Sequence, residues 1–441
     1  MCSIIKNAGS RDIFILNTAG HTPSALIYRP TLGICSMTKS ASSRPDPAGL
    51  KTGRPALYDA RHQHLREMMA HFGIPALLIV DPINIFYATG ARNMMFFSMR
   101  VPARYLLILS EGPTILYEYP GCAHLAEECA AITEIRPAQG LCFISSGGDP
   151  QTAAMQFAAE ISTAINAFDT TIDRLAVDRF PFTAIDALRS QGFSLTDADN
   201  VLQQARMRKL PTEIPYMREA MHRVETAVAQ LEADLEPGRT EAEVWAQYHH
   251  GLIAKEGHYV GTRLFQSGEK TFPYFKECSD RVMQRGDLVC LDTDALGYEG
   301  YAADFSRSFI CGDAKPTAIQ RQLFALANEQ LETNAAILKP GISYEELAET
   351  AWPIPPAYRD SHYSCIGHGL GLSGEYPNIP YKTEGQPYPL SGCIEPGMVI
   401  CLESYIGSRE AGEGVKLENQ YLVHDNAIEQ MSTYPLHDRL R

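Results

Sequence analysis

Short apolar runs alternate along the chain with segments in which apolar residues recur at helical spacing. In the first half, four apolar runs predict buried strands at residues 76–80, 105–109, 114–117 and 175–177. Helical spacing predicts helices at residues 62–72 and 153–165, and the turn residues Glu-Gly-Pro at 111–113 predict a hairpin between two of the strands. This alternation predicts an α/β domain over residues 56–206.

The second half, residues 207–441, contains two weakly similar copies of one unit. In each copy a helix ends at Pro-Gly, a second helix follows, and a buried strand ends in a carboxylate. LEPGRTEAE, starting at Leu235, matches LKPGISYEE, starting at Leu338, and GDLVCLD (286–292) matches GMVICLE (397–403). The helices are predicted at residues 211–235, 240–256, 316–338 and 344–351. Two such halves, related by a pseudo-twofold axis, bring their strand-end carboxylates together.

The remaining segment, residues 1–55, shows neither pattern. Residues 38–55 are dense in Ser, Pro, Gly and Lys, a composition typical of linkers. We therefore expect a flexible N-terminal arm in front of the two domains.

Composition excludes several classes of function. The formal net charge is −14, and no run of Lys and Arg forms the basic patch that a nucleic-acid-binding protein needs. No apolar run reaches the length of a membrane span. The eleven cysteines have no CxxC spacing and fit reduced, buried thiols better than a disulfide framework. We expect a cytoplasmic protein with a small-molecule ligand, without nucleic-acid or membrane partners.

Carboxylates cluster at the ends of the matched strands, and a histidine lies among glycines between them. Buried carboxylates repel one another, so a bound cation is the simplest way to stabilise the group; solvated turn aspartates and an ordinary loop histidine are the alternative for each residue alone. Five oxygen ligands and one imidazole suit Mn, Fe, Co, Zn or Mg, and several bridging carboxylates favour two ions over one. The predicted ligands are Asp292, Asp294, Asp304, His368, Glu403 and Glu418.

The C-terminal domain resembles the pita-bread fold of the M24 metallopeptidase and creatinase family, and residues 56–206 resemble that family's smaller N-terminal α/β domain. The segment DPINIFYATG, starting at Asp81, is typical of the family. The resemblance covers about residues 57–435. It implies that the family's five metal positions fall on one aspartate of the 292/294 pair and on the other four predicted ligands. It also implies a homodimer, with residues 92–99 as the segment that reaches across.

Two histidines with which the family's peptidases handle the scissile amide are absent. One belongs about twenty residues before the first metal aspartate, where this chain has TFPYFKEC (271–278). The other belongs just after the metal histidine, where this chain has SGEYP (373–377). Each missing donor removes about 3 kcal/mol of transition-state stabilisation. This argues against an efficient peptidase.

A narrower resemblance points to dimethylsulfoniopropionate lyases of the DddP type. It rests on Asp292-Thr-Asp294, on TRLFQSG (262–268) and on FKEC (275–278). It implies a six-ligand metal site and a β-elimination that gives dimethyl sulfide and acrylate. A sulfonium substrate needs aromatic faces, and the candidates are Tyr274 and Tyr376, together with Phe275 and Tyr363.

The chain departs from these lyases at the proton acceptor. They resemble one another in having an aspartate before a Glu-aromatic-Pro element, where this chain has Gly374. The candidate catalytic residues are therefore Tyr363, which matches a tyrosine of the lyases, and Glu375; Glu403 is a third candidate for the base.

Three hypotheses follow. The first is a metal-dependent carbon–sulfur lyase that acts on a small carboxylate such as dimethylsulfoniopropionate. The second is a metal-dependent Xaa-Pro dipeptidase or aminopeptidase, which rests on the fold and the five shared ligands. The third is an inactive binding homologue, against which the filled ligand positions weigh.

Overall fold

The computed structural model describes residues 36–39 and 46–441, and the rest of the predicted arm lies outside the described residues. The first helix, α1 (Pro47–His71), begins inside the segment that the sequence assigns to the arm. The carboxylate of Asp46 accepts hydrogen bonds from the backbone N–H groups of Ala48 and Gly49 (3.1 and 3.2 Å), and Pro47 occupies the first helical turn. A good N-cap thus starts the helix despite the linker-like composition.

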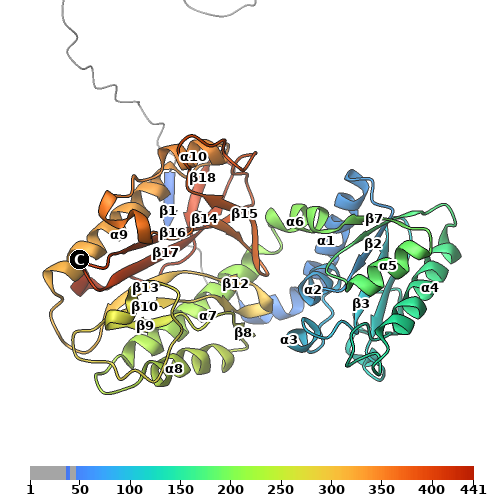
Figure 1. Ribbon diagram of the computed structural model, residues 1–441, viewed down its shortest axis with the longest axis horizontal. Coiled ribbons are helices and arrows are strands. Elements are labelled where there is room, and N and C mark those ends of the chain that lie inside the picture. The colour runs from blue at the N-terminus through green and yellow to red at the C-terminus, as the bar shows by residue number, and fades with distance from the viewer. Residues whose placement is uncertain (1–35, 40–45) are drawn as a thin grey trace, which may run out of the picture. The chain divides into compact units, whose positions relative to one another are not determined.

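The N-terminal domain is a six-stranded sheet with helices on both faces (Figure 1). Its strand order is β5-β4-β3-β2-β6-β7, and β3 is antiparallel to both neighbours, as the predicted hairpin requires. The predicted strands are confirmed within a residue or two. The strands are β2 (Ala76–Ile79), β3 (Tyr105–Leu109), β4 (Thr114–Glu118), β5 (Glu134–Pro137), β6 (Arg174–Val177) and β7 (Ser194–Asp197).

Side chains alternate between the two faces of this sheet and pack in two separate hydrophobic cores, one on each face. On one face, Leu78 and Leu107 pack with the helices α4 (Pro150–Phe168) and α5 (Phe182–Ser190). On the other face, Leu77 and Leu106 pack with α1 and two further helices. Those helices are α2 (Pro82–Thr89) and α6 (Asp199–Met207). A short helix, α3 (Met95–Ser98), follows α2.

The C-terminal domain contains the two predicted copies, each with its own helix pair. The helices α7 (Ile214–Ala233) and α8 (Glu241–Ile253) pack on a three-stranded sheet, β13-β10-β9, and α9 (Ala318–Ile337) and α10 (Tyr344–Thr350) pack on a six-stranded sheet, β1-β18-β17-β16-β14-β15. All four predicted helices are confirmed.

The strands that carry or directly follow predicted ligands are buried along their whole length, apart from a half-buried position at His368. They are β10 (Leu288–Asp292), β13 (Ser306–Ile310), β14 (Cys365–Leu370), β16 (Val399–Gly407) and β17 (Gly414–Val423). The other strands of this domain are β1 (Ser36–Lys39), β8 (Tyr259–Val260), β9 (Phe265–Ser267), β11 (Ala295–Leu296), β12 (Ala302–Ala303), β15 (Gly374–Pro380) and β18 (Ala427–Gln430).

Strand register sets which side chains meet. In the antiparallel pair β16–β17, Glu403 lies opposite Glu418, and in β14–β16, His368 lies opposite Cys401. Since directly opposed residues share a face of the sheet, this register gathers ligand-type side chains on one side. Among the described helices, none has the length and apolar character needed to cross a bilayer. The nine described cysteines are all free thiols.

Candidate metal centre

Three of the predicted ligands meet closely, and a cysteine joins them. Donor atoms of Asp304, His368, Cys401 and Glu418 all lie within 4.8 Å of one another. The His368 Nε2 atom is 3.3 Å from Oε1 of Glu403, 3.6 Å from Oε1 of Glu418 and 3.9 Å from Oδ2 of Asp304. Side chains from β14, β16, β17 and the segment before β13 thus converge on one point, as expected from two halves that face each other.

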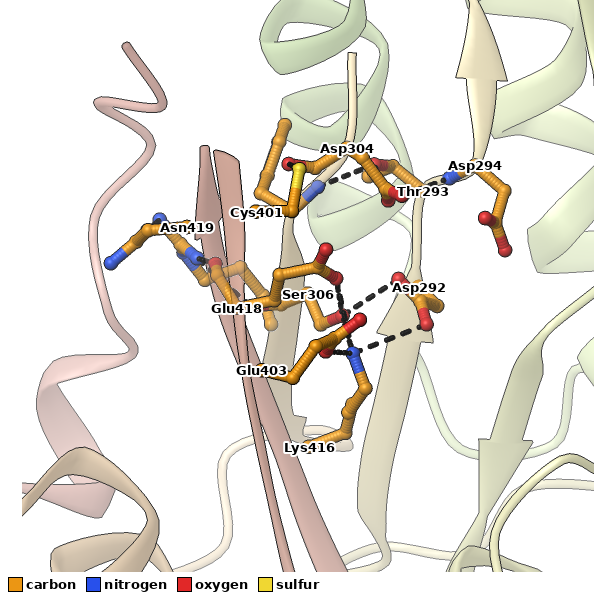
Figure 2. A network of polar contacts seen from close by, with 12 residues as sticks. Asp292, Thr293, Asp294, Asp304, Ser306, Cys401, Glu403, Lys416, Glu418 and Asn419 are labelled. Carbon is orange, nitrogen blue, oxygen red and sulfur yellow. Dashed lines mark hydrogen bonds and ion pairs between the residues drawn. The ribbon is translucent and has the colours of Figure 1, made fainter. Parts of the chain in front are cut away.

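The other two predicted ligands have protein hydrogen-bond donors of their own. Asp292 accepts hydrogen bonds from the Ser306 hydroxyl at Oδ1 (2.7 Å) and from the Tyr274 hydroxyl at Oδ2 (2.6 Å). Asp294 has a left-handed backbone (φ 39°), and its Oδ2 accepts a hydrogen bond of 2.5 Å from Thr262. In Figure 2 the Asp294 carboxylate lies apart from those of Glu403 and Glu418.

Two residues of the centre were missed from the sequence, Lys416 and Cys401. Lys416 is fully buried, and its Nζ atom lies among the carboxylates (Figure 2). It precedes Glu418 by two positions, as Cys401 precedes Glu403, so each shares a strand face with a predicted ligand. This two-residue spacing could have pointed to both residues. It is weak evidence, because lysine and cysteine occur in strands for many other reasons.

Burial and crowding perturb the titration of the centre. Burial raises the pKa values of Asp292, Asp304 and Glu403, and the neighbouring carboxylates add to the effect. Burial and the nearby Asp292 raise the pKa of Asp294 to about 7. Burial alone would also raise the pKa of Glu418, but Lys416 and His368 outweigh it and hold that pKa below its ordinary value. For Asp292, Asp304 and Glu403, burial and carboxylate repulsion outweigh the attraction of the nearby cationic groups, so the pocket favours additional positive charge.

The residues present fit a divalent cation. Oε1 of Glu418 is buried and accepts no hydrogen bond from any residue that the structure describes, although it faces His368 Nε2. An unsatisfied buried carboxylate oxygen is costly, and an ion beside the imidazole would satisfy it. Carboxylate oxygens with one imidazole suit Mn, Fe, Co or Zn, and a nearby thiol favours the softer of these ions.

An aromatic cavity of about 350 Å³ adjoins the centre. Its lining includes Tyr274, Phe275, Tyr363 and Tyr405, whose ring centroids lie 4.7–5.8 Å apart in successive pairs. Lys416 Nζ lies 4.7 Å from the centroid of the Tyr363 ring. The Tyr363 pKa lies far above its ordinary value, mainly because of the burial of its side chain and next because the Glu403 carboxylate is close, so the phenol stays protonated at neutral pH.

Glu375, a candidate catalytic residue, lies in a buried ion-pair cluster. Its Oε1 accepts from Arg206 Nη2 (2.8 Å) and its Oε2 from Lys209 Nζ (2.5 Å), and all three side chains are almost fully buried. Burial would raise the Glu375 pKa, but Lys209 and Arg206 outweigh it and lower that pKa, which weakens the carboxylate as a proton acceptor.

Tyr376 and Gly374 flank Glu375 on β15. The Tyr376 hydroxyl donates to the backbone carbonyl of Ser391 (3.1 Å), and its ring packs edge-on against Tyr344. These contacts lie outside the aromatic cavity, so substrate binding by Tyr376 stays a prediction without support from its surroundings. Gly374 is exposed, and a Cβ added there would meet no atom within 4 Å.

Comparison with known families matches both domains. Residues 215–425 match the model of metallopeptidase family M24, and residues 61–208 match the creatinase/prolidase N-terminal domain. The first of these matches begins seven residues after the second one ends.

Curated relatives include lyases and dipeptidases. The chain is 34% identical over 364 residues to the dimethylsulfoniopropionate lyase DddP of Roseovarius nubinhibens, which covers 81% of this chain and 82% of the other. It is 28% identical to the Xaa-Pro dipeptidase of Pyrococcus furiosus, over 53% of this chain and 65% of that enzyme. Among solved structures, the prolidase of Pyrococcus horikoshii OT3 shares the fold, with a TM-score of 0.68, 22% identity, and 86% and 99% of the two chains covered.

Proposed function

The chain belongs to metallopeptidase family M24, and on that basis we propose that it is a metal-dependent carbon–sulfur lyase that acts on dimethylsulfoniopropionate or a closely similar small carboxylate. One observation carries the proposal: two DddP lyases match 81–85% of the chain at 33–34% identity. The absence of the two peptidase histidines supports it.

The reaction is a β-elimination. A base takes a proton from the carbon beside the substrate carboxylate, the C–H electron pair becomes the new C=C bond, and the C–S pair leaves with neutral dimethyl sulfide, so that acrylate remains. A divalent ion, when bound, supplies Lewis-acid polarisation of the substrate carboxylate. We propose that Asp304, His368, Glu403 and Glu418 hold such an ion (Fe, Mn, Zn or Co), and that Asp292 and Asp294 complete the acidic pocket. The sequence predicts two ions, and that number stays a prediction.

The aromatic cavity is the proposed substrate site. Ring faces stabilise a desolvated sulfonium by cation–π attraction, and Tyr274, Phe275 and Tyr363 provide three faces in mutual contact. Tyr363 lines the cavity as a protonated phenol and is placed to donate a hydrogen bond to the substrate. Of the two candidate catalytic residues we therefore favour Tyr363 over Glu375, whose carboxylate is held by Lys209 and Arg206.

The test is headspace detection of dimethyl sulfide from purified protein loaded in turn with Fe, Mn, Zn or Co and mixed with dimethylsulfoniopropionate. We expect sulfide and acrylate in equal amounts, at a rate well above that of boiled protein. Sulfide no higher than in buffer with all four metals would exclude this substrate.

A metal-dependent Xaa-Pro dipeptidase is the second candidate, and the shared prolidase fold is the observation in its favour. Release of proline from Xaa-Pro dipeptides at rates comparable with those of established prolidases would support it over the lyase.

We also propose a homodimer in the cytoplasm. Four apolar side chains on and beside α3 are 46–59% exposed, which suits a surface covered by a second copy: Met94, Phe96, Phe97 and Met99. Light scattering after size exclusion tests this, with twice the chain mass of 48.8 kDa as the expected result.

A further inference from the structure

A lysine ammonium lies inside the acidic pocket, where a cation is expected. Lys416 Nζ is 2.7 Å from Oε2 of Glu403, 3.0 Å from Oε2 of Glu418 and 3.2 Å from Oδ2 of Asp292. It also donates to the Ser306 hydroxyl (2.6 Å). These four oxygens surround the ammonium as they would surround a small cation, and its side chain is 0% exposed.

The ammonium divides the oxygens of the pocket into two groups. For both Glu403 and Glu418, Oε2 contacts Lys416, whereas Oε1 faces His368. The oxygens on the His368 side therefore remain available to an ion, together with Oδ2 of Asp304.

On the opposite side the carboxylates have protein partners already. Both oxygens of Asp292 accept hydrogen bonds, from Ser306 and Tyr274, and Oδ2 also pairs with Lys416. Asp294 accepts a hydrogen bond from Thr262. Hydrogen bonds to the charged form stabilise a carboxylate without any metal, so this side has less need of a second ion than the five acidic side chains alone suggest.

We propose that the Lys416 ammonium takes the place of the second cation, so that this chain binds one divalent ion tightly, on the His368 side, instead of the two that the acidic ligand set predicts. Lys416 is then a positioning residue, because it fixes which oxygen of Glu403 and of Glu418 faces the ion. The inference rests on the metal dependence proposed above but not on the lyase reaction.

The test counts ions directly. The full-length protein is stripped with a chelator, incubated with excess Co²⁺, passed through a desalting column and analysed for cobalt and protein. We expect one cobalt per chain for the wild type. Lys416→Gln removes the ammonium and keeps a polar side chain that is one atom shorter, and we expect two cobalt ions per chain for it.

Matched variants locate the ion without altering Lys416. Asp292→Asn alters the side that Lys416 occupies and should leave one cobalt per chain, whereas His368→Asn should reduce the count to nearly zero. Circular dichroism of the stripped proteins confirms that each variant is folded.

Three results would overturn the proposal. They are two tightly bound cobalt ions in the wild type, loss of the ion in Asp292→Asn, and a folded Lys416→Gln protein that still binds one. The first two need no change at Lys416, so the proposal remains testable even if that variant fails to fold. No dimethylsulfoniopropionate is present, so a failure of the lyase assay is a separate result.

Discussion

The hydroxyl of Tyr274 donates a 2.6 Å hydrogen bond to Oδ2 of Asp292, and this bond joins the wall of the aromatic cavity to the edge of the metal centre. Tyr274 lies in the segment between β9 and β10, where the resemblance to the family's peptidases implies one of their histidines. Burial, reinforced by Asp292, raises the pKa of Tyr274 well above its ordinary value, so the phenol keeps the proton that it shares with the carboxylate.

Tyr274→Phe removes this bond and leaves the ring in place. We expect the free energy of unfolding of the metal-free protein to fall by about 1.5–3 kcal/mol, because the lost bond was made to a buried charged group. The count of bound Co²⁺ should stay at one per chain. Denaturant titration and cobalt analysis measure the two quantities.

Tyr405→Phe is the matched control for that variant. Its hydroxyl donates to the backbone carbonyl of Thr271 at 2.6 Å, from the same aromatic cluster but to a neutral acceptor. Its cost should therefore be lower, about 0.5–1.5 kcal/mol. Equal losses in the two variants would contradict a charged Asp292 as the acceptor.

Glu375→Gln leaves two buried cations, Arg206 and Lys209, without their shared carboxylate. We expect a loss of about 3–5 kcal/mol in the free energy of unfolding, because unpaired buried charges are costly. Glu395→Gln is the control: Glu395 pairs with Arg208 at 2.7 Å, but both side chains are more than a third exposed, so its loss should be below about 1 kcal/mol. An unchanged stability with abolished turnover would instead support Glu375 as the catalytic base.

Gly374→Asp supplies a carboxylate where DddP-type lyases are expected to have their base. The backbone can accept it, since an added Cβ meets no atom within 4 Å. A positioned general base contributes on the order of 10²–10⁴-fold, so we expect dimethyl sulfide release to rise about 100-fold or more. Gly374→Asn, similar in shape but without a basic carboxylate, should stay at the wild-type rate. Equal rates in the two variants would show that no base is needed at this position.

The partly buried His258 should make the folding stability of the protein sensitive to acid. Burial, with the adjacent Arg92 guanidinium, lowers the His258 pKa to about 4, and the neutral Nε2 accepts a hydrogen bond from Arg92 (2.9 Å). In the unfolded chain the pKa returns to about 6.5, so the unfolded state binds more protons between pH 6.5 and 4. The stability contributed by neutral His258 is therefore present above pH 6.5 and is lost as the pH falls to 4, by about 3 kcal/mol in total.

His258→Gln keeps an acceptor for Arg92 but cannot be protonated. Denaturant titrations of both proteins at pH 7 and pH 5 measure the effect. We expect the wild type to lose more stability than the variant between these values; parallel losses would show that His258 titrates normally in the folded protein.

The sequence alone determined which elements form and where the acidic residues lie on them. The paired segments at Leu235 and Leu338 showed that one unit occurs twice, and the strand-end carboxylates showed where the halves face each other. These features are local, because a period of two or 3.6 residues and a Pro-Gly stop depend only on near neighbours. On that basis Asp304, His368, Glu403 and Glu418 were expected together, and they do lie together.

Only the tertiary structure decided the partners of individual charges. Glu375 meets Arg206 and Lys209 across more than 160 residues of chain, and no local pattern connects α6 with β15. Lys416 looks like an ordinary strand lysine in the sequence. It is found inside the acidic pocket only because β17 turns that face toward β10, on the same side of the sheet as Glu403 of the neighbouring strand β16. The energy of a buried charge depends on which side chains surround it after packing. The position of the Lys416 ammonium inside the acidic pocket and the ion pairs of Glu375 with Arg206 and Lys209 therefore follow from packing and not from the order of residues.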